Sequence, residues 1–298
     1  MREPIFTGVC TAVVTPFDPH GAINYDVFAK LIDQQITAGV DALCICGTTG
    51  ECSTMSIREH IAAVEFAVKH INHRVKVVAG AGSNDTSAAV YLSQHAQDSG
   101  ADALLHVTPY YNKASQAGLI KHYEYIADRV EIPIIVYNVP ARTGVSFTAE
   151  SYFQLSKHPL INGVKEASGN FSLLAHTHHL CGDDFYTWSG NDDQVVPMMS
   201  LGSKGVISVV SNIIPEVMVK MSHLCLEGKF KEAAKIQIEY MDFIDSMFIE
   251  VNPIPIKTAM NLLGMEVGGL RLPLCEPTEA HLEVMKKSMQ RIGLPIQA

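Results

Sequence analysis

Apolar segments of five or six residues recur eight times before residue 211, and amphipathic segments separate them. The apolar segments are rich in β-branched residues and nearly free of polar interruptions. Segments of this length and character are typical of strands buried on both faces of a parallel sheet. The predicted strands are residues 9–14, 41–46, 75–80, 103–108, 132–137, 161–165, 185–189 and 205–210.

The intervening segments have helical periodicity. Residues 24–38 place their large apolar side chains on one side at helical spacing. Residues 56–70 begin with Ser56 and Glu59, a capping-box pattern that marks the start of a helix. Eight strand–helix repeats predict a closed (β/α)₈ TIM barrel in preference to an open doubly wound sheet.

The last part of the chain does not follow this alternation. We expect a long helix near 229–250, a turn at the Asn-Pro-Ile-Pro segment 252–255, and two further helical stretches. No Gly/Ser-rich linker precedes this part, so it should pack on the barrel. The predicted organisation is a barrel at 1–228 that carries the active site, followed by a C-terminal helical appendage at 229–298.

In such barrels the chemistry lies at the carboxyl ends of the strands. Lys165 ends the predicted strand 161–165, directly after an apolar segment. A lysine there either pairs with a carboxylate or points into the mouth of the barrel. Burial would disfavour its ammonium form and leave a free amine able to attack a carbonyl. Glu166 should face the opposite way, because side chains alternate along a strand.

Hydroxyl-bearing residues end the neighbouring strands. Tyr137 could transfer protons for an amine catalyst, with Thr48 and the Tyr110-Tyr111 pair as hydrogen-bond partners. A tyrosine at this position is also a common amphipathic rim residue. The backbone of Gly-Thr-Thr-Gly at 47–50 could bind a carboxylate through its N–H groups.

Composition and charge exclude several classes of protein. The chain is 47% hydrophobic and 18% charged, enough apolar material for a sizeable core and too little polarity for disorder. Its formal charge of −9 is spread along the sequence, so no basic nucleic-acid surface is indicated. No apolar segment approaches the roughly 18 residues of a membrane span, and no signal core opens the chain. We expect a soluble, cytoplasmic protein.

Neither the cysteines nor the histidines indicate a metal site. The seven cysteines form no CxxC pair and suit buried positions in a reducing compartment. Cys44 and Cys46 should share one face of a strand. His176, His178 and His179 cluster in a helical segment without further ligands at metal-binding spacing, so we expect surface histidines. No dinucleotide or phosphate-loop motif is present, and no cofactor or metal is expected.

Taken together, these segments resemble the dihydrodipicolinate synthase/N-acetylneuraminate lyase family of class I aldolases. The resemblance rests on three motifs, Gly-Thr-Thr-Gly-Glu at 47–51, Tyr-Asn-Val-Pro-Ala-Arg-Thr-Gly at 137–144 and Gly-Val-Lys-Glu-Ala-Ser at 163–168. It extends over nearly the whole chain, from Thr-Pro-Phe at 15–17 to Asn-Pro-Ile-Pro-Ile-Lys at 252–257.

The resemblance implies a mechanism. Lys165 forms an imine with pyruvate, whose carboxylate is held by the backbone amides of Thr48 and Thr49. Tyr137 delivers and removes protons. Thr48 and Tyr111 complete a relay with it, and Tyr111 comes from the neighbouring subunit of a tight dimer.

At two places the chain resembles the synthases of the family more than its sialic-acid lyases. The sialic-acid lyases usually carry Ser-Thr at the place of Thr48-Thr49. They also lack an arginine at the place of Arg142, which in the synthases holds the carboxylate of L-aspartate 4-semialdehyde. Without the resemblance, Arg142 would be read as a structural ion-pair residue. Gly190 and Ile207 match positions that line the pyruvate pocket.

The resemblance also bears on assembly and regulation. Family members are commonly homotetramers, built as dimers of dimers. In members inhibited by lysine, Tyr110, Asn84 and His60 match residues that bind the inhibitor. Those members carry His and Glu at the positions of Ile57 and Ala88, so we predict weak or absent inhibition by lysine.

Two other functions remain open at this point. One is another pyruvate-dependent class I aldolase of the same fold, such as one that cleaves sialic acid or a 2-keto-3-deoxy sugar acid. The other is a non-catalytic ligand sensor. The Lys165, Tyr137, Thr48 and Tyr111 set argues against a sensor, because binding alone does not need a proton relay.

Overall fold

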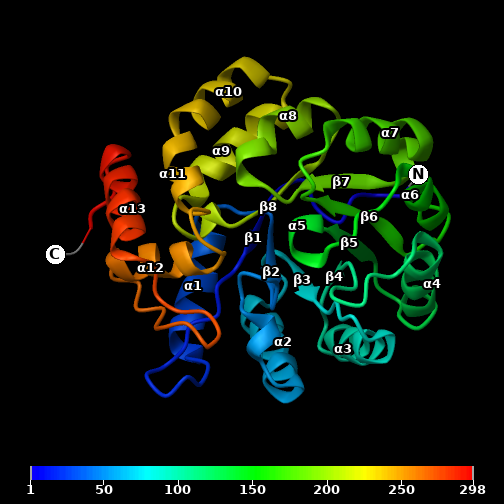
Figure 1. Ribbon diagram of the computed structural model, residues 1–298, viewed down its shortest axis with the longest axis horizontal. Coiled ribbons are helices and arrows are strands. Elements are labelled where there is room, and N and C mark those ends of the chain that lie inside the picture. The colour runs from blue at the N-terminus through cyan, green and yellow to red at the C-terminus, as the bar shows by residue number, and fades with distance from the viewer. Residues whose placement is uncertain (1, 297–298) are drawn as a thin grey trace.

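The computed structural model describes residues 2–296 and contains a closed barrel of eight parallel strands surrounded by helices (Figure 1). The predicted (β/α)₈ TIM barrel is confirmed, and every predicted strand overlaps an observed one. The strands are β1 (Gly8–Ala12), β2 (Ala42–Ile45), β3 (Lys76–Gly80), β4 (Ala103–Val107), β5 (Ile134–Asn138), β6 (Ile161–Glu166), β7 (Tyr186–Ser189) and β8 (Gly205–Ser208).

Helices follow the strands and cover the outside of the barrel (Figure 1). The α-helices are α1 (Tyr25–Thr37), α2 (Ile57–Ile71), α3 (Thr86–Asp98), α4 (Gln116–Ala127), α5 (Pro140–Thr143), α6 (Ala149–Leu155), α7 (Phe171–Cys181), α8 (Val195–Ser200), α9 (Pro215–Leu226), α10 (Phe230–Glu239), α11 (Met241–Ser246), α12 (Ile254–Leu262) and α13 (Glu279–Arg291). Short 3₁₀ helices lie at η1 (Cys52–Thr54), η2 (Gly182–Asp184), η3 (Asp192–Gln194) and η4 (Val210–Asn212). The predicted capping box is present, because Ser56 and Glu59 exchange side-chain and backbone hydrogen bonds at the start of α2. None of the helices in residues 2–296 is long and apolar enough to cross a membrane.

Pairing of the first and last strands closes the barrel. β1 pairs in parallel with β2 on one side and with β8 on the other, and Gly8 stands opposite Gly205. A Cβ atom at Gly205 would lie 1.9 Å from the Gly8 carbonyl oxygen. The two backbones can therefore meet at this seam only because residue 205 has no side chain.

The apolar side chains form two cores. The inner core fills the barrel and includes Val78, Ile135, Trp188 and Ile207. The larger outer core lies between the strands and the helices. Side chains of one strand alternate between the two cores, which explains why the strands are apolar on both faces.

One prediction about the cysteines is wrong. Cys44 lies in the inner core and Cys46 in the outer core, so they do not share a face. The alternation fails because Cys46 follows the end of β2 and has a φ of 55°, which rotates its side chain outward. The seven thiols are free, and Cys10, Cys44, Cys46 and Cys225 are buried as expected. The expectation of burial is wrong for the exposed Cys275, which lies in the loop before α13, and holds only in part for Cys52 and Cys181, which are half-buried.

The C-terminal region differs from the prediction in two places. The long helix expected at 229–250 is interrupted at Tyr240, which joins α10 to α11 with a φ of −96° and a ψ of 4°. This change of direction lets Phe243 and Ile244 enter the outer core. The expected turn at 252–255 is shorter, because α12 already begins at Ile254 and its first turn accepts a proline. The region packs on the barrel through the contact of α10 with α9, while α13 packs on α11 and α12.

Candidate active site

The carboxyl ends of β5 and β6 bring the predicted amine and the predicted proton donor together. The two strands pair so that Tyr137 stands opposite Lys165. Both side chains are largely buried, and the Lys165 Nζ lies 4.3 Å from the centroid of the Tyr137 ring. The strand register therefore places a lysine and a tyrosine side by side at the mouth of the barrel.

No carboxylate in residues 2–296 lies within ion-pair distance of Lys165. Its neighbour Glu166 faces the outer core as predicted. The Glu166 carboxylate accepts hydrogen bonds from Asn138 Nδ2 at 3.0 Å, from the Tyr152 hydroxyl at 2.9 Å and from the Ser168 amide at 2.8 Å. Because Glu166 is fully engaged elsewhere, the Lys165 amine is not neutralised by it.

Gly190 leaves room for the lysine. It follows β7, and its amide donates to the Glu166 carbonyl at 2.8 Å. A Cβ atom at this position would lie 3.2 Å from the Lys165 Cε and 2.7 Å from the Ala167 Cβ. The close approach explains the glycine predicted to line the pocket, because any side chain would press on the lysine.

The loop that follows β2 presents backbone amides. Gly50 donates to the Gly47 carbonyl and Glu51 to the Thr48 carbonyl, each at 3.1 Å, which folds the loop into a turn. Within the described part of the chain, the amides of Thr48 and Thr49 find no acceptor. Two free N–H groups in a tight turn form a suitable site for a carboxylate.

Arg142 is joined to this loop by a residue that the sequence did not single out. The Arg142 Nη2 donates to the Asn252 carbonyl oxygen at 3.0 Å, and the Asn252 Nδ2 donates to the Thr49 Oγ1 at 3.0 Å. Asn252 is buried, and its Oδ1 has no hydrogen-bond partner in residues 2–296. The only signal for Asn252 was its place at the start of the Asn-Pro-Ile-Pro-Ile-Lys motif.

Two other predicted residues differ sharply in exposure. Ile207 lies on β8 in the inner core and is fully buried. Tyr111 is 90% exposed and has a φ of 72°, so its side chain does not join the buried group around Lys165 of its own chain. A left-handed backbone is unfavourable for a bulky residue and marks a strained position in this loop.

A buried carboxylate that the sequence did not reveal lies between the ends of β7 and β8. Asp192 Oδ2 accepts hydrogen bonds from the amides of Val209 at 2.9 Å and Val210 at 3.1 Å. Burial raises the pKa of Asp192 above its ordinary value. Asp192 thereby fixes the loop that follows β8, next to Ile207.

The histidines form no metal site. No group of three or more His, Cys, Asp or Glu side chains suited to a metal ion occurs within residues 2–296. His176 and His179 are exposed as predicted, but His178 is half-buried and its Nε2 lies 3.1 Å from the Thr187 Oγ1. The surface prediction is therefore wrong for His178, because α7 packs this side of its helix against β7.

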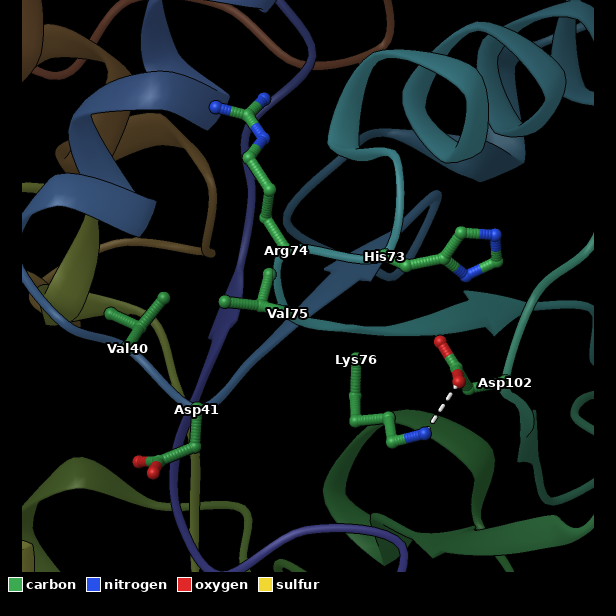
Figure 2. Close-up of a pocket in the computed structure, with 7 residues that line it drawn as sticks. All are labelled: Val40, Asp41, His73, Arg74, Val75, Lys76 and Asp102. Carbon is green, nitrogen blue, oxygen red and sulfur yellow. Dashed lines mark hydrogen bonds and ion pairs between the residues drawn. The ribbon is translucent and has the colours of Figure 1, made fainter.

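The opposite end of the barrel contains a cavity of about 410 Å³ where β2, β3 and β4 begin (Figure 2). Figure 2 shows the Lys76 ammonium directed at Asp102, and the two groups form an ion pair of 2.8 Å. The carboxylate of Asp102 also accepts from the Val77 amide, and Asp41 accepts from the Val9 amide, each at 2.8 Å. These charges connect strand starts to one another, which is a structural role.

Comparison with known proteins shows what the chain resembles. Residues 5–292 match the model of the dihydrodipicolinate synthetase family. The 4-hydroxy-tetrahydrodipicolinate synthase of Acetivibrio thermocellus is 48% identical over 99% of this chain and 100% of its own. The crystal structure of dihydrodipicolinate synthase from Aquifex aeolicus is 40% identical with a TM-score of 0.96, covering 98% of this chain and 100% of that one. The crystal structure of the chloride-inhibited dihydrodipicolinate synthase from Acinetobacter baumannii complexed with pyruvate is 35% identical with a TM-score of 0.95. The match covers 97% of this chain and 99% of that one.

Proposed function

The chain belongs to the dihydrodipicolinate synthetase family, and we propose that it condenses pyruvate with L-aspartate 4-semialdehyde through a Schiff base on Lys165. This is the reaction of a 4-hydroxy-tetrahydrodipicolinate synthase, a lyase of lysine biosynthesis. The observation that carries the proposal is a buried lysine at the carboxyl end of β6 that has no carboxylate partner in the described chain.

The pyruvate half of the reaction follows from the groups around Lys165. The Nζ adds to the C2 carbonyl of pyruvate, and loss of water from the carbinolamine gives an imine. The free amides of Thr48 and Thr49 hold the pyruvate carboxylate. Loss of a C3 proton converts the imine to an enamine, the nucleophile of the condensation.

Each of these steps moves a proton, and we assign its transfer to Tyr137, whose ring lies against the Lys165 Nζ. We assign the rest of the relay to Thr48 and to Tyr111 of a second copy of the chain. The 90% exposure of Tyr111 supports this assignment, because its hydroxyl is presented outward and not to the Lys165 of the same chain. We therefore propose a tight dimer, and two such dimers as a homotetramer.

Arg142 suits the second substrate. Arg142 is exposed as a residue, and its guanidinium is steadied by the Asn252 carbonyl oxygen in a partly buried contact. A planar guanidinium binds a carboxylate through two parallel hydrogen bonds. It would hold the carboxylate of L-aspartate 4-semialdehyde while the enamine carbon attacks the aldehyde. Attack of the substrate's own amine on the imine carbon then closes the ring and releases Lys165.

We propose that the chain is divided into a barrel at 1–228 and a helical region at 229–298. The end of α9 at Leu226 and the start of α10 at Phe230 support a boundary between them. Residue 1 and residues 297–298 lie outside the described part of the chain. Seven free cysteines support a reducing compartment, and we propose the cytoplasm.

The proposal is tested by a choice of substrates. The purified protein is incubated with pyruvate and L-aspartate 4-semialdehyde, and product is followed in a coupled assay. A parallel assay offers N-acetylneuraminate and measures release of pyruvate. We expect turnover with the first pair only. Cleavage of N-acetylneuraminate without condensation would instead indicate a lyase, and no turnover in either assay would refute the proposal.

A further inference from the structure

A second buried lysine lies near the mouth of the barrel, and the proposed mechanism does not use it. Lys257 is on α12, in the C-terminal region, and its side chain is 1% exposed. Its Nζ lies 2.8 Å from the Glu51 Oε1, and both partners of this ion pair are buried. Glu51 is the last residue of the turn that contains Thr48 and Thr49.

The contacts of Lys257 keep it from acting as a nucleophile. Its Nζ donates to the Glu51 carboxylate, to the Thr15 carbonyl oxygen at 3.1 Å and to the Gly269 carbonyl oxygen at 2.6 Å. Three acceptors require three hydrogens, which only the ammonium form has. Burial lowers the pKa of Lys257, but the Glu51 charge opposes this shift.

These bonds join three segments at the mouth of the barrel. Thr15 follows β1, Glu51 belongs to the loop after β2, and Gly269 lies in the loop between α12 and α13. The other carboxylate oxygen of Glu51 accepts from the Arg271 amide at 3.0 Å, and the Thr15 Oγ1 donates to the Gly50 carbonyl at 2.7 Å. Glu51 itself has a φ of 56°, a conformation that such surroundings must maintain.

Stability alone is a weak explanation for this arrangement. A buried ion pair loses much of its attraction to the cost of desolvation, and an apolar pair of the same volume is often as stable. Charged hydrogen bonds are directional, however, and fix the position of the groups that they join. The group fixed here is the turn whose two free amides face no acceptor in the described chain.

We propose that Lys257 and Glu51 are positioning residues for the pyruvate carboxylate site, an inference that rests on the proposed function. The C-terminal region thereby sets the geometry of a site built by the barrel. The pair holds the amides of Thr48 and Thr49 where the carboxylate must lie for its ketone to meet Lys165. Its loss should weaken pyruvate binding without removing the reactive amine.

The test uses the double variant Glu51→Gln/Lys257→Met, which removes both charges and leaves neither one unpaired. Borohydride reduction in the presence of pyruvate measures how much Lys165 has formed an imine. We expect the pyruvate concentration for half-maximal trapping to rise by at least about tenfold, the effect of a misplaced binding group. The trapped fraction at saturating pyruvate should remain near that of the unsubstituted protein.

Met260→Ala is the matched control, because Met260 is buried on the same helix, belongs to the outer core and makes none of the hydrogen bonds of Lys257 or Glu51. Its thermal unfolding temperature should fall while its pyruvate dependence stays within about twofold. An unchanged pyruvate dependence in the double variant, or an equal rise in Met260→Ala, would overturn the inference.

If the double variant does not fold, Glu51→Gln alone is measured, since the amide keeps an oxygen that faces Lys257. The pyruvate concentration for half-maximal trapping should then rise by about threefold or more, and the absence of a rise would contradict the inference. Trapping in the unsubstituted protein separates the two proposals. Its absence refutes the Schiff-base function, whereas normal trapping with an unaffected double variant refutes only the role of the pair.

Discussion

Lys257 and Lys165 are both buried, but the groups that surround their amines differ. Lys257 is enclosed by three oxygen acceptors, one of which is charged. Lys165 lies over the face of Tyr137, and no carboxylate in residues 2–296 pairs with it. A nucleophilic amine must lose its proton and keep its lone pair accessible, so only the second environment suits Schiff-base chemistry.

At the same scale, Tyr137→Phe tests the proton carrier. The ring remains against Lys165 while the hydroxyl is lost, and kcat for the condensation should fall by about two to four orders of magnitude. Tyr123→Phe is the control, because its hydroxyl is also buried and donates to the His106 carbonyl on the outside of the barrel. Steady-state rates within a few-fold of normal in Tyr137→Phe would remove Tyr137 from the mechanism.

Single residues also show where sequence patterns lose their predictive value. Alternation along a strand correctly placed Glu166 away from Lys165, since both residues lie within β6. The same reasoning failed for Cys46, which lies one residue beyond the end of β2 and has a positive φ. Strand periodicity is reliable only while the backbone stays extended, and the sequence does not mark the residue where it stops.

Among the elements, the contact of α3 and α4 with β4 encloses two histidines that lack full hydrogen bonding. His106 pairs with Ser93 and His122 with Thr86, but one ring nitrogen of each has no partner in the described chain. Burial lowers the pKa of His106 to about 3 and that of His122 to about 4.

These shifts predict that the fold is less stable in mild acid. The unfolded chain binds protons at both rings below about pH 6.5, whereas the folded chain does not until about pH 4 and pH 3, so stability is lost as the pH falls between these values. Protonation of the two histidines in the unfolded chain should together lower the free energy of unfolding by on the order of 3 kcal/mol between pH 7 and pH 5. Urea unfolding at fixed protein concentration measures the change.

The double variant His106→Asn/His122→Asn should unfold at a lower urea concentration at pH 7. Its free energy of unfolding should, however, fall less between pH 7 and pH 5 than that of the unsubstituted protein. His20→Gln serves as the control, because this exposed imidazole stays in water whether or not the chain folds. An acid dependence as steep in the double variant as in the unsubstituted protein would show that other groups cause it.

Element boundaries were predictable where one feature dominates the local sequence. The strands are the clearest case, because burial on both faces makes each one nearly uniformly apolar. The break at Tyr240 was not predictable, because the helical pattern of α10 continues through it. The break lets Phe243 pack in the outer core, a tertiary contact that the local sequence does not indicate.

On the scale of the whole molecule, the site depends on contacts between distant parts of the chain. Asn252 and Thr49 are separated by 203 positions, and Lys257 and Glu51 by 206. Periodicity predicts which residues share a face of one element, but it contains no information about such pairs. The proximity of Lys165 and Tyr137 was predictable because the barrel itself brings the strand ends together.

The proposed assembly also bears on regulation, and we predict weak or absent inhibition by lysine. Ile57 is 52% exposed at the start of α2, and Ala88 is half-buried on α3, where the inhibited pattern has His and Glu. Without a carboxylate, a lysine ammonium loses a contact of about 1.5–3 kcal/mol, or roughly tenfold to hundredfold in affinity. Steady-state inhibition assays should give no sub-millimolar effect.

The double variant Ile57→His/Ala88→Glu provides the converse experiment. It restores the charged partner on an otherwise matching surface, so inhibition should strengthen by about tenfold or more. Sub-millimolar inhibition of the unsubstituted protein would contradict the prediction directly.

Covalent capture of pyruvate by the amine at position 165 is the central step of the proposed mechanism. Mass spectrometry of the borohydride-reduced protein should find one pyruvate-derived adduct per chain, located on the peptide that contains Lys165. Lys165→Arg should form no adduct and lose turnover, while its Lys257 remains unmodified. An adduct on another residue, or condensation at the normal rate in Lys165→Arg, would contradict the mechanism.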